Sequence, residues 1–198
     1  IKNDDQTEAE RKYTMKITND MIILDSDPRI RSKSEPVTLP LSKEDEELLR
    51  AMITYVRDSQ DDEIAEREGL RPAVGIAAIQ LGIPKQLIAV SVPTEDGSDE
   101  FALANPKIVS ESVQNAYLAQ GEGCLSVLEE HEGLVYRHAR ITVKGYDLLR
   151  GENVRIRATG YTAICLQHEI DHLSGTLFYD HIHTEDPWRE DPEAMVIG

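Results

Sequence analysis

The sequence predicts an α+β fold in which short antiparallel or mixed β-sheets pack around one central α-helix, with a further helix on the surface near the N-terminus. Three observations lead to this prediction. An amphipathic segment comes early in the chain, short β-branched runs separated by turn residues fill its middle, and a largely apolar segment with two histidines follows. The 198 residues are enough for one domain with its own core.

The first expected helix follows Ser42, which has the residue type of a helix N-cap. Acidic residues occupy the next turn, as the positive end of a helix dipole favours. Apolar residues then recur at intervals of three and four, which places them on one helical face: Leu48, Leu49, Met52, Ile53 and Val56. We expect a surface helix whose apolar stripe faces the core.

The middle of the chain, after a charged segment at 61–71, predicts a series of strands. The run LIAVSV at 87–92 is typical of a strand, and a loop rich in Asp, Gly and Ser follows it at 94–100. Four further short runs, with a turn at 147–153 before the last, are typical of antiparallel strands: 107–109, 133–136, 141–143 and 154–158.

The last expected element is a helix over about 162–173, which Gly175 closes. We expect residues 15–183 to form the domain and residues 184–198 to form a surface tail. Because Met15 has the residue type of a natural start, residues 1–14 are expected to be an extension or a remnant of cloning. They contain no signal-peptide pattern, so a cytoplasmic location is expected.

Charge and composition narrow the classes of partner. The formal net charge of −16 disfavours direct binding to a nucleic-acid backbone or to an anionic membrane, because both would repel the protein. No apolar stretch approaches the roughly 20 residues of a membrane span. Without a secretion signal, Cys124 and Cys165 are expected to be free thiols rather than a disulfide.

The central helix carries the chemistry. His168, Glu169 and His172 form the pattern H-E-x-x-H. Four residues make slightly more than one helical turn, so both imidazoles project from one face and can bind one metal ion, with the carboxylate beside it. The flanking residues 163–166 and Ile170 are apolar, which argues against two surface histidines at a chance spacing.

A catalytic site of this kind needs a third protein ligand and keeps one position open. Cys165 lies on the same helix, but two turns along a straight helix is a poor position from which to close a tetrahedron with His172. Cys124 lies in GEGCLS at 121–126, where small residues let an ion or substrate approach the backbone. We favour Cys124, and we interpret Cys165 as a small buried hydrophobic residue.

Three separated motifs resemble the peptide deformylases, metalloenzymes that remove the N-formyl group from the initiating methionine of new proteins. The motifs are GIAAIQ at 75–80, EGCLS at 122–126 and QHEIDH at 167–172, in the order that the family has them. The similarity extends over about 15–182, and the insertion at 58–71 resembles the longer form typical of Gram-positive bacteria. Two residues depart from the family pattern: Ala73 stands where Gly is usual, and Ile79 where Pro is usual.

The resemblance implies a role for each motif residue. Cys124, His168 and His172 would bind the ion, and Glu169 would move the proton of the attacking water. The side chain of Gln80 and the backbone N–H of Leu125 would stabilise the developing oxyanion, and Glu122 would pair with Arg137. The substrate peptide would contact residues from all three motifs and the helix: Val74, Gly75, Gly123, Tyr161, Ile164 and Cys165.

The resemblance also implies a cofactor and partners. One divalent ion is expected, Fe²⁺ in the cell, with Zn²⁺ or Ni²⁺ able to substitute, because a thiolate and two imidazoles accept several metals. The expected substrates are N-formylmethionyl nascent peptides at the ribosome, and the enzyme is expected to act as a monomer.

Two other functions share part of the pattern. A zinc endopeptidase also has H-E-x-x-H, but it would normally take its third ligand from a downstream His or Glu rather than from an upstream cysteine. A redox-sensing protein would use Cys124 as the group that leaves the ion on oxidation. In such a sensor Glu169 would have no essential role.

Overall fold

The computed structural model describes residues 15–198, and the prediction for residues 1–14 lies outside this range. Its helices are α2 (Lys43–Ser59), α3 (Asp62–Glu68) and α4 (Gly160–His172), with 3-10 turns η1 (Asn19–Met21), η2 (Pro28–Arg31), η3 (Ala78–Leu81) and η4 (Phe178–His181). Its strands are β1 (Gly75–Ala77), β2 (Leu87–Thr94), β3 (Gly97–Glu111), β4 (Asn115–Leu118), β5 (Arg137–His138), β6 (Arg140–Asp147), β7 (Glu152–Thr159) and β8 (Met195–Ile197).

The strands form two sheets. The larger is antiparallel throughout, in the order β1-β2-β3-β6-β7, and the smaller has the order β5-β4-β8. Within the smaller sheet β5 runs antiparallel to β4, whereas β8 runs parallel to it. The predicted combination of antiparallel and mixed sheets in an α+β fold is confirmed.

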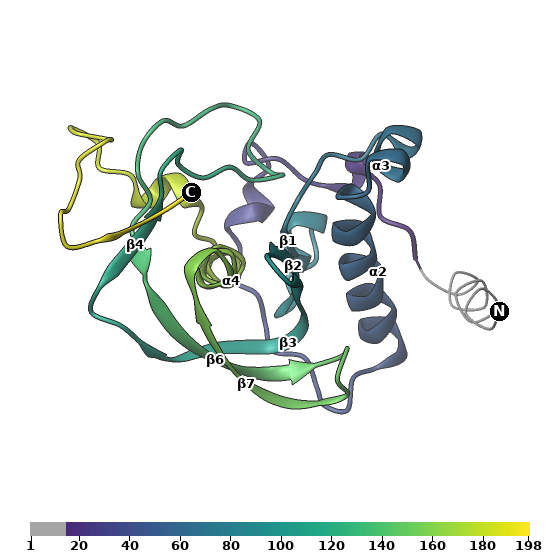
Figure 1. Ribbon diagram of the computed structural model, residues 1–198. Coiled ribbons are helices and arrows are strands. Elements are labelled where there is room, and N and C mark those ends of the chain that lie inside the picture. The colour runs from purple at the N-terminus through teal and green to yellow at the C-terminus, as the bar shows by residue number, and fades with distance from the viewer. Residues whose placement is uncertain (1–14) are drawn as a thin grey trace.

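Helix α4 lies at the centre of the molecule, between the β1–β2 side of the large sheet and β4 (Figure 1). Helix α2 packs on the opposite side of β1 and β2. The two sides of β2 alternate accordingly: Leu87 and Ala89 belong to the hydrophobic cluster of α2, and Ile88 and Val90 to that of α4. Because both faces of β2 are buried, its sequence is a continuous apolar run.

The expected amphipathic helix is confirmed as α2. Ser42 is its N-cap, with Oγ accepting a hydrogen bond from the backbone N–H of Asp45 at 3.1 Å. The expected strands at 87–92, 107–109, 141–143 and 154–158 lie within β2, β3, β6 and β7. The central helix begins at Gly160, two residues before the predicted start.

The structure adds one helix to the prediction and corrects it in two places. Part of the charged segment, for which no structure was predicted, is helix α3, capped by Asp61 and by Gly69 in the left-handed conformation. Strand β3 already begins at Gly97, inside the expected loop, as the returning arm of a hairpin with β2. Residues 133–136 form no strand, because the backbone N–H of Leu134 donates to the carbonyl of Pro187 in the tail.

The tail itself contributes β8, whose partner β4 is far away in the sequence. Among residues 15–198, no helix combines the length and the apolar character needed to cross a membrane.

Candidate active site

Helix α4 presents His168, Glu169 and His172 to one place. Apolar residues surround most of the helix, so it is buried on nearly all sides and its polar side chains are held rigidly. The rings of His168 and His172 lie 5.2 Å apart between centroids, one helical turn from each other. The spacing that suggested a shared ligand therefore exists in three dimensions.

Cys124 approaches these histidines from the loop that follows β4. Its Sγ lies 3.5 Å from Nε2 of His172. The ligand atoms of Cys124, His168 and His172 all lie within 4.8 Å of one another, a spacing that one ion can bridge. A thiolate with two imidazoles is a donor set that holds zinc and similar divalent metals. The residues present therefore fit a single divalent ion.

Cys165 takes no part in this group. Burial raises the pKa of its thiol, and nearby carboxylates act in the same direction. A thiol that stays protonated is a poor metal ligand, since binding requires the thiolate. Both the position of the three ligand atoms and the raised pKa of Cys165 agree with the choice of Cys124.

The surroundings of His168 favour positive charge at the cluster. Burial alone would lower the pKa of His168, but hydrogen bonds to Cys124 and Glu122 raise it well above its usual value. Burial lowers the pKa of His172, which favours the neutral ring that a metal ligand needs, whereas on His168 a metal ion would take the place of the proton. A site that draws protons onto one histidine is electrostatically suited to a cation.

A buried ion pair orients His168. Glu122 Oε1 lies 2.8 Å from Nδ1 of His168, and its carboxylate also accepts two hydrogen bonds from Arg137 at 2.7 and 2.8 Å. The side chains of Glu122 and Arg137 are each 3% exposed. Because Nδ1 is engaged, Nε2 of His168 is free to bind metal. Arg137 also donates to Asp171, so the pair is tied to α4 itself.

Glu169 lies beside this cluster and is almost inaccessible to solvent. Its side chain is buried, and Oε2 has no hydrogen-bond partner among the described residues. Burial raises the pKa of Glu169 to about 7. Gly75 of β1 makes room for it, since a Cβ at that position would lie 2.5 Å from Oε1. A carboxyl group with a free oxygen and a pKa near neutrality is suited to accept and return a proton.

Gln80 reaches the cluster from η3. Its Oε1 accepts a hydrogen bond from the backbone N–H of Ala77 at 2.9 Å, which leaves the amide Nε2 to point toward Ser126 Oγ at 3.1 Å and Cys124 Sγ at 3.5 Å. The side chain is 1% exposed. A fixed N–H donor is thereby held next to the ligand cluster.

A cavity of about 720 Å³ opens onto this group. Eleven of the twelve residues that the sequence assigned to catalysis, metal binding or substrate binding line it, while His172 lies behind it, 1% exposed. The eleven are Val74, Gly75, Gln80, Gly123, Cys124, Leu125, Tyr161, Ile164, Cys165, His168 and Glu169.

Other lining residues were not singled out by the sequence, among them Arg71, Leu118 and Gln120. Arg71 donates from Nη1 to the carbonyl oxygen of Leu125 at 2.8 Å and so ties the cysteine loop to the segment before β1. A lone arginine 54 residues from its partner has no spacing signal that would identify it.

Comparison with known proteins agrees with this geometry. The model of the polypeptide deformylase family matches residues 20–188. A peptide deformylase of Staphylococcus epidermidis is 50% identical over 184 residues, which cover 91% of this chain and 100% of the relative. Peptide deformylase 2 of Geobacillus stearothermophilus is 50% identical over 183 residues, 92% of this chain and 99% of the relative.

Solved structures show the same architecture. The peptide deformylase of Ehrlichia chaffeensis superposes with a TM-score of 0.68 at 28% identity, covering 87% of this chain and 91% of the other. A probable peptide deformylase from Synechococcus phage S-SSM7 gives a TM-score of 0.66 at 34% identity, covering 81% and 98%. The chain belongs to the polypeptide deformylase family.

Proposed function

We propose that this peptide deformylase removes the N-formyl group from the N-terminal methionine of newly made proteins by means of Cys124, His168, His172, Glu169, Gln80 and Leu125. The observation that carries the proposal is the convergence of three ligand atoms within 4.8 Å of one another at the wall of a cavity that Glu169 and Gln80 also line. The reaction is the hydrolysis of a formyl amide to formate and a free amine.

Cys124, His168 and His172 would hold one divalent ion. When bound, such an ion lowers the pKa of water, so that hydroxide is available near neutral pH. The ion in the cell would be Fe²⁺, with Zn²⁺ or Ni²⁺ as substitutes, because the thiolate and imidazole ligands accept each of them. Elemental analysis of protein purified without added metal and without oxygen identifies the ion.

Glu169 would transfer the proton. Its carboxylate accepts a proton from the attacking water, and it donates that proton to the departing nitrogen as the bond between the formyl carbon and nitrogen breaks. A pKa raised by burial makes both transfers favourable near neutral pH. Gly75 has no side chain, and this leaves the space that the carboxylate occupies.

Gln80 and Leu125 would stabilise the oxyanion. Attack on the formyl carbon places negative charge on the carbonyl oxygen, and donors fixed in advance lower the energy of that state. The side-chain amide of Gln80 is fixed through Ala77, and Arg71 holds the carbonyl oxygen of Leu125, the residue whose N–H would be the second donor. Both residues line the cavity next to Cys124.

The remainder of the cavity would take the peptide. Val74, Ile164, Cys165 and Tyr161 offer an apolar surface to the methionine side chain. Gly75 and Gly123 lie on the cavity wall, where their backbone groups are available to an extended chain, as in strand addition. The substrates would be nascent peptides at the ribosome, and the enzyme would act on them as a monomer in the cytoplasm.

One assay tests the proposal on the unmodified protein. Release of the acyl group is compared between formyl-Met-Ala and acetyl-Met-Ala, with ferrous iron and without oxygen. We expect rapid hydrolysis of the formyl peptide and little of the acetyl peptide. Cleavage of an internal peptide bond instead would support the endopeptidase alternative and contradict the proposal.

A further inference from the structure

The last strand, β8, lies directly behind one wall of the cavity. It pairs in parallel with β4, with Ala116 opposite Met195 and Leu118 opposite Ile197. The backbone N–H of Ala119 also donates to the carbonyl of Ile197 at 2.9 Å. Leu118 at the end of β4 and Gln120 in the chain that follows both line the cavity wall. Strand β8 is therefore hydrogen-bonded to β4 and Ala119, the segment that forms this part of the cavity wall.

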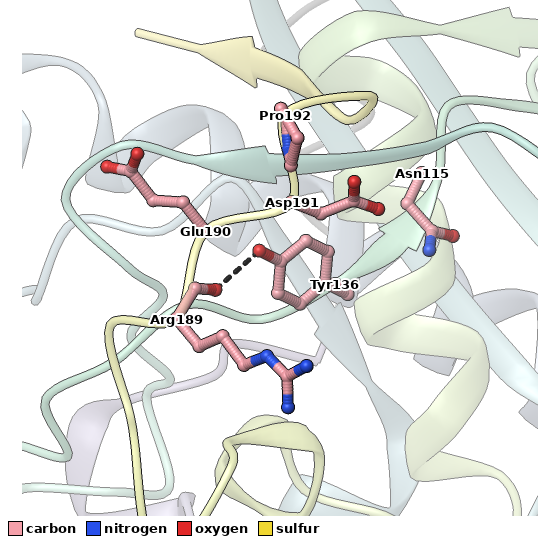
Figure 2. Close-up of a pocket in the computed structure, with 6 residues that line it drawn as sticks. All are labelled: Asn115, Tyr136, Arg189, Glu190, Asp191 and Pro192. Atoms are coloured by element: carbon pink, nitrogen blue, oxygen red, sulfur yellow. Dashed lines mark hydrogen bonds between the residues drawn. The ribbon is translucent and has the colours of Figure 1, made fainter.

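The segment that precedes β8 is anchored by the residues that come directly before β4 and β5. Figure 2 shows the hydroxyl of Tyr136 directed at the carbonyl oxygen of Arg189, to which it donates at 2.5 Å. The side-chain amide of Gln114 donates to the carbonyl of Glu193 at 3.1 Å. These hydrogen bonds fix the position from which β8 enters the sheet, so the strand is an integral part of the domain.

The inward side of β8 reaches the residues behind the cavity. Ile164 is 1% exposed and forms a small hydrophobic cluster with Ala116 and Ala139, against which Leu118 and Ile197 pack. Leu118 and Ile164 also line the cavity. Ile197 thus supports, from outside, a cluster whose inner members face the substrate. Val196 has the alternate position on the strand and is 57% exposed.

We propose that β8 sets the shape of the substrate pocket and that Ile197 is a positioning residue for the side chain of the substrate's first residue. The inference rests on the proposed function, since it assumes that the methionine side chain lies against Ile164. Ala116, Ala139 and Ile164 fill little volume by themselves. Ile197 from β8 therefore completes this cluster. Loss of that side chain lets Leu118 and Ile164 relax outward, away from the substrate.

Steady-state kinetics of the iron-loaded variants Ile197→Val and Ile197→Ala test the inference. We expect KM for formyl-Met-Ala to rise in steps, reaching about four- to fifteenfold in Ile197→Ala, the effect of one to two methylene groups of lost contact. The value of kcat should stay within about twofold, because no group that acts on the formyl carbon is altered. Preference for formyl-Met-Ala over formyl-Leu-Ala should fall along the same series.

Val196→Ala is the matched control, since it shortens the neighbouring side chain on the exposed side of the same strand. We expect it to keep the KM and the preference of the unmodified enzyme. Unchanged KM and preference in both Ile197 variants would overturn the inference, and so would a loss of kcat at constant KM. If Ile197→Ala does not fold, Ile197→Val decides alone, with a rise in KM of about twofold expected, the effect of about half a methylene group of lost contact. Failure of the unmodified protein to release formate would instead contradict the proposed function.

Discussion

At the scale of single residues, the environment of Glu169 distinguishes this site from a structural metal cluster. One carboxylate oxygen is buried without a hydrogen-bond partner among the described residues, and burial raises the pKa of the group to about 7. A buried, unsatisfied carboxyl group costs free energy of folding. The proposed role of that oxygen, handling the proton of a reacting water, explains its place next to three side chains that could bind one metal ion.

Gly75→Ala should disable this carboxylate without removing it. The added Cβ would lie 2.5 Å from Oε1 of Glu169 and 2.8 Å from its Cγ, so the side chain must move. We expect kcat to fall by about 100-fold, as for a displacement of about 1 Å in a catalytic group, while the metal content stays the same. Gly151→Ala, on the turn before β7, is the control: its Cβ meets no atom within 4 Å, and although its φ of +69° makes the change strained, kcat should stay the same. Full activity of Gly75→Ala would contradict this role of the contact.

Arg137→Met should reveal the cost of the buried ion pair. Glu122 would keep its position at 3% exposure but lose both hydrogen bonds from the guanidinium. We expect the free energy of unfolding to fall by about 3–5 kcal/mol, because one charge is left buried without its partner. Urea denaturation measures this free energy of unfolding. Arg157→Met, on the exposed side of β7, is the control. A loss below about 1 kcal/mol would show that the pair is replaceable.

At the scale of elements, the site depends on α2 only indirectly, through the sheet that α2 covers. Arg57 near the end of α2 forms a bidentate pair with Glu100 of β3, with the shortest distance 2.6 Å. The hydrogen bond from Arg57 holds the pKa of Glu100 below its ordinary value of 4.5, against the opposing effect of burial. The pair therefore joins a helix and a strand in a pH-dependent way.

The pH dependence of this link has a definite sign. A carboxyl group whose pKa is lower in the folded state binds protons more weakly there, so its stabilisation is complete above pH 4.5 and is lost as the pH falls through the folded pKa. Both side chains are partly exposed, so we expect Glu100→Gln to lose only about 0.2–1 kcal/mol at pH 7. The difference from the unmodified protein should vanish at lower pH. A deficit that grows with acidity would contradict the assignment, and Glu152→Gln at the start of β7 serves as the control.

The elements that were predictable are those whose signals are local. Helix α2 has its cap and its apolar stripe within 17 residues, and β2 its run of apolar residues. Helix α3 has both caps, but only Ile64 and Ala65 pack against the core, so its apolar periodicity is weak. Residues 133–136 have the composition of a strand, yet their hydrogen bonds go to the tail, which no local pattern reveals.

At the scale of the whole molecule, the candidate site joins segments that are distant in sequence. Cys124 and His172 are 48 residues apart, and Gln80 is 44 residues from Cys124. The histidine spacing was readable because one helix carries it, and the choice of Cys124 over Cys165 followed from the poor position of Cys165 on that helix, whereas the role of Gln80 followed from resemblance to a family. The support from Arg71 and from β8 depends on tertiary packing, and sequence spacing contains no sign of it.

Removal of the ion should therefore loosen the whole domain. An ion held by Cys124, His168 and His172 links the loop after β4 to α4 and stabilises only the folded state. At an ion concentration about 100 times Kd the stabilisation is about 2.7 kcal/mol, which corresponds to roughly 5–10 °C in Tm for a chain of this size. Thermal unfolding with and without a chelator measures it, and added metal should restore Tm. His172→Ala should show no response to chelator, and an equal Tm for the metal-loaded and metal-free protein would contradict the link.

The most direct test of the central claim is the variant Glu169→Gln, which keeps the shape of the side chain and removes its ability to take up a proton. Metal content and formate release from formyl-Met-Ala are measured on the same sample, with ferrous iron and without oxygen. We predict one metal ion per chain, as in the unmodified protein, and a loss of about 100- to 10,000-fold in kcat. A variant that keeps its metal and releases formate at the unmodified rate would show that Glu169 does not move the proton.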